Sequence, residues 1–201
     1  NLKEIGIDYL LIPEKNDIEN FSNPFDIKLE PKKITDDLCG KFRPGHFLAV
    51  IDIIHRFFQI IKPKNILLGR KDYQQIIVIK ELIKIYNYNI NIISADTVRN
   101  KDGLALSSRN NFLTKEEIKI ASEIQSSLLL SKKLYDDNVS VNEITTKINE
   151  LFLESSINLE YFAIRDLNTL QHRNDNDLIA LIAVYLGEIR LIDNIIIKSK
   201  P

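Results

Sequence analysis

The fold class is decided by the stretch that begins Asn65-Ile-Leu-Leu-Gly-Arg-Lys-Asp-Tyr-Gln-Gln75 and ends in the apolar run at 90–95. Residues 65–68 predict a short buried strand, and Gly69 turns the chain out of it. The residues after this turn predict a helix, because apolar side chains recur along one face at Ile76, Ile79, Ile83 and Tyr86. The order strand–helix–strand, with short apolar strands, predicts a parallel sheet covered by helices.

The residues before this unit predict a strand, a polar connection and a second helix. Residues 7–12 read as a short strand that Pro13 closes. Residues 14–37 are polar and interrupted by prolines, so we expect loop and edge structure there. A helix begins near His46 with apolar residues at helical spacing and stops before Pro63.

The residues after the long loop at 96–110 predict a different kind of unit. Capping boxes begin at Thr114 and Ser140, the first opening a helix to about Tyr135. Three β-like runs follow at 159–166, 178–186 and 189–197, and Gly187-Glu188 fits a tight hairpin turn between the last two. We therefore expect an α/β domain at 1–112 and a small α+β domain with antiparallel strands at 113–201.

Composition excludes several classes of protein. The 201 residues are 44% hydrophobic and 27% charged, which is globular usage and not that of a disordered, collagen-like or coiled-coil chain. Lys+Arg (27) nearly balances Asp+Glu (28), so no overall charge attracts nucleic acid or an anionic membrane. The single cysteine excludes an internal disulfide, and three scattered histidines argue against a zinc site.

The sequence shows no targeting signal. The longest apolar stretch, 178–186, is far shorter than the roughly 18 residues of a spanning helix, and residues 1–15 do not read as a signal peptide. We expect a cytoplasmic protein. The chain begins with Asn1 and contains no methionine, so we also expect that residues upstream are missing.

Three segments carry side chains suited to phosphate or substrate binding. Gly69 to Gln75 follows a strand and opens a helix, where amide groups, the helix dipole and Lys71 favour an anion. Asp102 to Asn110 holds Ser107, Ser108 and Arg109, two hydroxyls and a guanidinium suited to polyphosphate oxygens. Cys39 to Phe47 holds Arg43 and His46 beside a turn. Each segment taken alone is also compatible with a solvated helix start or a polar loop.

Together these segments resemble the pantothenate synthetase (pantoate–β-alanine ligase) family. The resemblance is carried, in the family's order and spacing, by residues 38–47, 69–75, 102–110 and by Arg190-Leu-Ile-Asp-Asn194. It implies a Rossmann-like nucleotide-binding domain at 1–112, here incomplete, and a C-terminal lid domain. It also implies ATP-dependent joining of pantoate to β-alanine through pantoyl adenylate, with Mg²⁺ accompanying ATP, in a homodimer.

The resemblance also implies roles for single residues. Gly69, Arg70, Lys71 and Asp72 match the nucleotide-binding segment, with Asp72 on ribose and Lys71 on the phosphates. Gln75 matches a pantoate-binding glutamine, and Val98 a residue whose backbone meets adenine. The phosphate-binding loop is matched by Leu106, Ser107, Ser108 and Arg109, of which the last three join Lys71 as expected catalytic groups. Arg43 and His46 match a motif near the site without a firm role.

Two departures from the family pattern leave alternatives open. The family's His-x-Gly-His motif is absent and would precede Asn1, so we expect that these 201 residues alone cannot form pantothenate. Arg70 stands where the family normally has glutamate. The alternatives are another adenylate-forming or nucleotidyl-transferring enzyme, and a non-catalytic relic that lacks the upstream motif.

Overall fold

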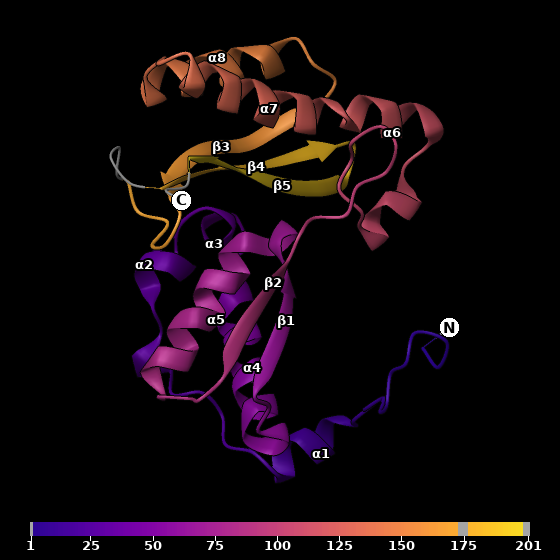
Figure 1. The fold of residues 1–201 in the computed structure, drawn as a ribbon, viewed down its shortest axis with the longest axis vertical. Coiled ribbons are helices and arrows are strands. Elements are labelled where there is room, and N and C mark those ends of the chain that lie inside the picture. The colour runs from indigo at the N-terminus through magenta and orange to yellow at the C-terminus, as the bar shows by residue number, and fades with distance from the viewer. Residues whose placement is uncertain (1, 173–176, 199–201) are drawn as a thin grey trace.

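The computed structural model describes residues 2–172 and 177–198 and contains two sheets with their helices. A parallel pair, β1 (Asn65–Gly69) and β2 (Asn91–Ala95), packs against α4 (His46–Ile61) and α5 (Tyr73–Ile85). An antiparallel sheet of β3 (Asn158–Asp166), β4 (Leu178–Leu186) and β5 (Ile189–Lys198) lies across the end of this unit (Figure 1). Three helices cover its far side, namely α6 (Lys115–Ala121), α7 (Glu123–Asp136) and α8 (Val141–Leu153). The fold is thus the expected α/β unit followed by an α+β unit.

The parallel pair confirms the strand–helix–strand prediction, with one correction. The register runs from Asn65 opposite Asn91 to Gly69 opposite Ala95. Side chains alternate along each strand, so Ile66 packs toward the helices while Leu67 is 69% exposed and Ile93 is 50% exposed. The strand at 65–68 is therefore half-exposed and not buried, because helices cover only the other face of the sheet.

The antiparallel sheet explains the apolar run at 178–186. β4 is the central strand, and its residues are buried from Leu178 to Val184 because β3 and β5 flank it and α7 (Glu123–Asp136) and α8 (Val141–Leu153) cover the sheet. The predicted hairpin turn is confirmed: Leu186 pairs with Ile189, and Gly187 has a positive φ of 54°.

Several local predictions are wrong. Residues 7–12 form no strand, because no strand in the described chain lies beside them to accept or donate main-chain hydrogen bonds. The segment lies on the surface, where Tyr9 is 93% exposed. The segment 14–37 contains short helical turns, namely α1 (Lys15–Asn20), a 3₁₀ turn (Ile27–Leu29) and α2 (Lys32–Thr35). The helix after Thr114 divides into α6 (Lys115–Ala121) and α7 at Ser122, whose hydroxyl donates to the Lys119 carbonyl.

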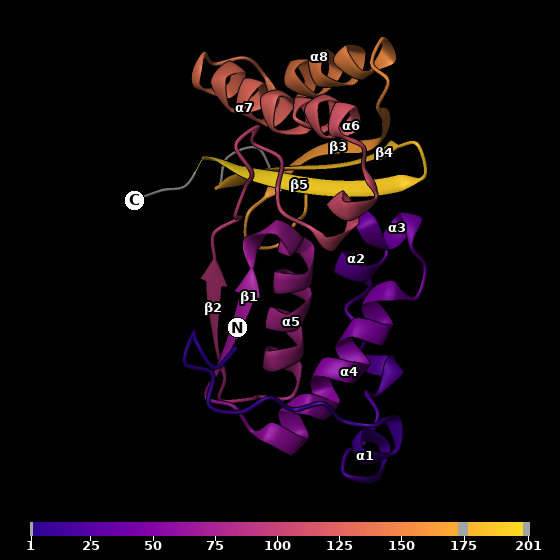
Figure 2. The same ribbon diagram turned by 90° about the vertical axis from the view of Figure 1, so that its right-hand side faces the viewer.

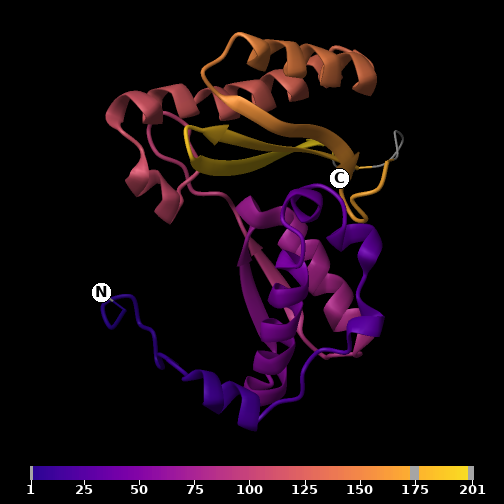
Figure 3. The ribbon, with the colours of Figure 1, turned by 180° about the vertical axis from the view of Figure 1, so that it is seen from behind.

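The arrangement of the two units positions the site. Figure 2 shows the arrows of β1 and β2 pointing toward the antiparallel sheet. Figure 3 shows the N-terminal segment extending away from the body of the molecule. The carboxyl ends of the parallel strands therefore face β5 and the short helix α3 (Cys39–Phe42). The division between residues 112 and 113 stays a prediction.

Candidate functional site

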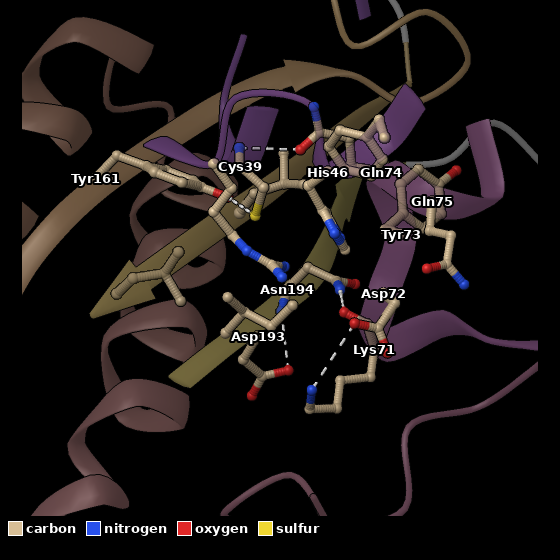
Figure 4. Close-up of a pocket in the computed structure, with 15 residues that line it drawn as sticks. Cys39, His46, Lys71, Asp72, Tyr73, Gln74, Gln75, Tyr161, Asp193 and Asn194 are labelled. Atoms are coloured by element: carbon tan, nitrogen blue, oxygen red, sulfur yellow. Dashed lines mark hydrogen bonds and ion pairs between the residues drawn. The ribbon is translucent and has the colours of Figure 1, made fainter. Parts of the chain in front are cut away.

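A small cavity lies where the β1–α5 connection, the α3–α4 turn and the antiparallel sheet meet (Figure 4). Its volume is about 40 Å³. Its polar lining comes from elements far apart in the sequence and includes Arg43, His46, Lys71, Asp72, Gln75 and Asn194. In an open parallel sheet, ligands bind at the carboxyl ends of the strands, and this cavity occupies that position.

The β1–α5 connection contributes Lys71 and Asp72. Residues Arg70–Asp72 form a 3₁₀ turn between the strand and the helix, so successive side chains point in different directions. Lys71 and Asp72 line the cavity, and the Lys71 Nζ lies 4.0 Å from an Asp72 carboxylate oxygen. The Arg70 guanidinium is instead paired with Asp96 at 2.8 Å and does not line this cavity. Gly69 ends β1 just behind this turn.

The α3–α4 turn contributes Arg43 and His46. Gly45 precedes α4 with a φ of +78°, a conformation that glycine adopts without strain, and His46 is the first residue of the helix. Burial lowers the pKa of His46, and the positive charges of Arg43, Arg190 and Arg109 lower it further, whereas Asp72 opposes them. The imidazole is therefore held neutral in a positively charged environment, which favours an anionic ligand.

Two adjacent glutamines at the start of α5 have different surroundings. Gln74 is buried; its Oε1 accepts from the Cys39 N–H at 3.0 Å, and its Nε2 donates to the Ile34 and Asp37 carbonyls at 2.7 and 2.8 Å. Both glutamines line the cavity, but Gln75 makes none of these bonds. The sequence had singled out Gln75, and the structural importance of Gln74 was missed because its partners are remote in the chain.

The wall of the cavity contains a buried polar cluster that sequence reasoning also missed. Cys39 Sγ lies 3.1 Å from the Tyr161 hydroxyl and 3.4 Å from the Arg190 guanidinium. A β-bulge between Leu159 and Tyr161 aims Glu160 at Arg190, and the two side chains form a buried ion pair at 2.5 Å. Burial disfavours the charged guanidinium, but the hydrogen bonds that it donates to Glu160 and Cys39 outweigh this effect and raise the pKa of Arg190.

Strand β5 contributes Asp193 and Asn194, to which the sequence assigned no role. Both line the cavity, and they are only 4% and 5% exposed. Figure 4 shows Asn194 between Asp193 and the Lys71–Asp72 turn. The available signal was the Asp-Asn pair itself, because two adjacent polar residues inside an apolar strand require buried partners.

The loop at 98–109 lies beside β5, outside the cavity lining. The Leu106 N–H donates to the Val98 carbonyl at 2.9 Å, and both side chains are exposed. Ser107 precedes the 3₁₀ turn Ser108–Phe112, and its hydroxyl accepts from the Arg109 N–H at 3.3 Å. The Arg109 guanidinium donates to the Arg190 carbonyl at 3.5 Å, and its charge acts on His46. The structure thus gathers Arg43, His46, Lys71, Asp72 and Gln75 in one cavity and leaves this loop at its border.

Two features are absent from the described chain. Within residues 2–172 and 177–198, no group of three or more His, Cys, Asp or Glu side chains is placed to hold a metal ion. Over the same residues, no helix is both long and apolar enough to cross a membrane.

Comparison with known proteins places this site within a family. Residues 1–196 match the family model described as Pantoate-beta-alanine ligase. A pantothenate synthetase from Coprothermobacter proteolyticus is 35% identical over 204 residues, which cover 98% of this chain and 71% of that protein. A bifunctional pantoate ligase/cytidylate kinase from Prochlorococcus marinus is 38% identical over 203 residues, covering 98% of this chain and 39% of that protein.

Solved structures agree. Pantothenate synthetase from Thermus thermophilus superimposes with a TM-score of 0.89 at 30% identity, covering 98% of this chain and 72% of that one. The ligase from Francisella tularensis, complexed with beta-gamma ATP and beta-alanine, has a TM-score of 0.72 at 37% identity over 99% of this chain and 68% of that one. From the match along nearly its whole length, the chain belongs to the pantoate-beta-alanine ligase family.

Proposed function

We propose that this protein joins pantoate to β-alanine in two ATP-dependent steps. In the first, a carboxylate oxygen of pantoate bonds to the α-phosphorus of ATP, the bond to the β-phosphate bridge breaks, and pyrophosphate leaves. In the second, the β-alanine nitrogen bonds to the acyl carbon, the acyl–phosphate bond breaks, AMP leaves, and the amine loses a proton to solvent. Family membership supports both steps, as does the Francisella tularensis relative complexed with beta-gamma ATP and beta-alanine.

The observation that carries this proposal is the shared cavity of Lys71, Asp72 and Gln75 with Arg43 and His46. Adenylation requires that two anions, a carboxylate and a triphosphate, be held together while charge develops at phosphorus. The guanidinium groups of Arg43, Arg109 and Arg190, whose charges lower the pKa of His46, provide positive potential for that purpose. The cavity contains an acceptor and an amide for hydroxyl groups as well, in Asp72 and Gln75.

The residue roles are proposed from family membership, and the shared cavity of Lys71, Asp72 and Gln75 supports three of them. Lys71 neutralises phosphate charge as pyrophosphate departs, Asp72 accepts from the ribose hydroxyls, and Gln75 binds pantoate. Gly69 and Arg70 complete the nucleotide-binding segment, and the backbone of Val98 meets adenine. The loop Leu106–Arg109 binds the phosphates, a role supported by the effect of the Arg109 charge on His46.

The remaining components are proposed from family membership. Mg²⁺ enters with ATP as part of the substrate, since phosphate oxygens are the ligands that this ion prefers beside one or two carboxylates. We propose further that the protein acts as a homodimer in the cytoplasm.

The test is pantoate-dependent exchange of labelled pyrophosphate into ATP, measured on the full-length protein. We expect exchange with pantoate, little with other small hydroxy acids, and pantothenate formation once β-alanine is added. Lys71→Ala lowers the exchange rate by about 100-fold, the usual scale for removing one group that stabilises transition-state charge. The control is Lys84→Ala, on the helix that follows and with its side chain 78% exposed, which leaves the rate unchanged. Absence of exchange in the parent, or equal exchange with unrelated acids, refutes the proposal.

A further inference from the structure

Strand β5 holds two adjacent polar side chains where the chain is otherwise apolar. Asp193 and Asn194 follow Ile192 and precede Ile195, and they are 4% and 5% exposed. A buried amide or carboxylate without hydrogen bonds costs several kcal/mol, so the partners of these groups explain why they are there. The partners of Asn194 belong to a segment proposed to bind ATP, and the partner of Asp193 is Arg99, in the loop at 98–109.

The amide of Asn194 reaches the β1–α5 connection. Its Nδ2 donates to the Arg70 carbonyl and to the Lys71 carbonyl, each at 2.9 Å. These two carbonyls belong to the peptide groups on either side of the Lys71 α-carbon. One amide therefore fixes both peptide planes that flank Lys71, and with them the direction in which the Lys71 side chain leaves the backbone.

The backbone of Asn194 is itself held in place. Its main-chain N–H donates to the Asp193 carboxylate at 2.8 Å, and that carboxylate is bound by both terminal nitrogens of the Arg99 guanidinium at 2.5 and 3.0 Å. Arg99 also donates to the Gly103 carbonyl at 3.0 Å, within the second proposed ATP-binding segment. The position of Asn194 is thus fixed from both sides, which a positioning group requires.

We propose that Asn194 is a positioning residue that directs Lys71 at the phosphates of the nucleotide. The inference rests on the function proposed above, because the role of Lys71 is part of it. Asn194 belongs to the antiparallel sheet, and its hydrogen bonds hold the turn that follows the first strand of the parallel sheet. These bonds therefore fix the position of Lys71 relative to the antiparallel sheet. Misplacing a charged group by about 1 Å can lower the rate by about 100-fold. We therefore expect the loss of these two hydrogen bonds to lower kcat.

A double-mutant cycle on the full-length protein tests this proposal, with pantoate-dependent pyrophosphate exchange as the assay. Asn194→Ala is expected to lower kcat by about tenfold or more and to leave the KM for pantoate within about twofold, since Gln75 is untouched. When Lys71 is already alanine, Asn194→Ala is expected to lower the rate by less than about threefold, because its target is gone.

A merely structural role predicts a different outcome. In that case Asn194→Ala lowers the rate by the same factor with and without Lys71, and this result overturns the proposal. Asn194→Ser, which keeps one donor and removes less volume, is the second variant and is expected to fall between the parent and Asn194→Ala. Asn91→Ala is the matched control, because that asparagine lies at the far end of β2, where its side chain donates to Asn65 at 3.3 Å.

The same experiment separates this inference from the function on which it rests. A parent protein without exchange refutes the proposed function, and the inference fails with it. A parent with normal exchange and an Asn194→Ala variant with unchanged kcat refutes the inference alone.

Discussion

The adjacent glutamines at the start of α5 give a sharp test of which residue supports the fold. We predict that Gln74→Leu, a change of nearly equal volume, destabilises the protein by about 3 kcal/mol. The magnitude comes from its three hydrogen bonds to Cys39, Ile34 and Asp37, each contributing about 1 kcal/mol net. The loss of stability is larger where the substitution leaves a buried main-chain group without a partner. This applies to the Cys39 N–H, whose hydrogen bond to Gln74 is buried.

The measurement is urea unfolding monitored by circular dichroism, with Gln75→Leu as the control. Gln75 is the next residue of the same helix, carries the same side chain and lines the cavity. Its replacement is expected to change the unfolding free energy by less than about 1 kcal/mol while raising the KM for pantoate. If Gln74→Leu unfolds within about 0.5 kcal/mol of the parent, the argument that this side chain fastens the 34–39 segment to α5 is refuted.

Three further predictions concern charge, space and pH. Arg70→Glu places a carboxylate beside Asp96, and we expect it to lower the free energy of unfolding by about 1 kcal/mol. Adding Asp96→Arg should restore that stability. If urea unfolding shows no recovery in the double variant, the pairing is contradicted. Gly40→Ala would place a methyl group 1.6 Å from the Thr35 carbonyl oxygen, so we expect the free energy of unfolding to fall by about 3 kcal/mol and the melting temperature to fall with it. An unchanged melting temperature would contradict this expectation. The pKa of His46 is lowered in the folded protein, so His46 contributes stability that is present above about pH 6.5 and lost as the pH falls below that value; in urea unfolding at several pH values, His46→Gln should flatten that loss.

Short-range patterns were sufficient to predict most of the elements. The capping boxes at Thr114 and Ser140 are confirmed, because the hydroxyl and the glutamate three residues later bond each other's backbone. The continuous apolar run at 178–186 correctly indicated a buried strand. Residues 7–12 have the same composition as a strand but lack a partner in the described chain, and composition alone does not supply one.

The candidate site was predictable only in part. Lys71, Asp72 and Gln75 follow a strand end, and the structure places all three at the cavity; their roles stay predictions. The pairing of Glu160 with Arg190 depends on a β-bulge, and no spacing in the sequence marks a bulge. Long-range partners of this kind become visible only after the strands have been placed side by side.

The parallel pair has a consequence for handling the protein. Within the described residues, β1 and β2 each have only one hydrogen-bonded neighbour, and Leu67 and Ile93 lie bare on the adjoining face. The unpaired main-chain N–H and C=O groups of an edge strand can bond to a strand of another molecule, and exposed aliphatic side chains beside them favour this association, so both promote aggregation. Concentrated preparations of these 201 residues should therefore scatter light increasingly with time, and a lysine in place of Leu67 should keep them clear.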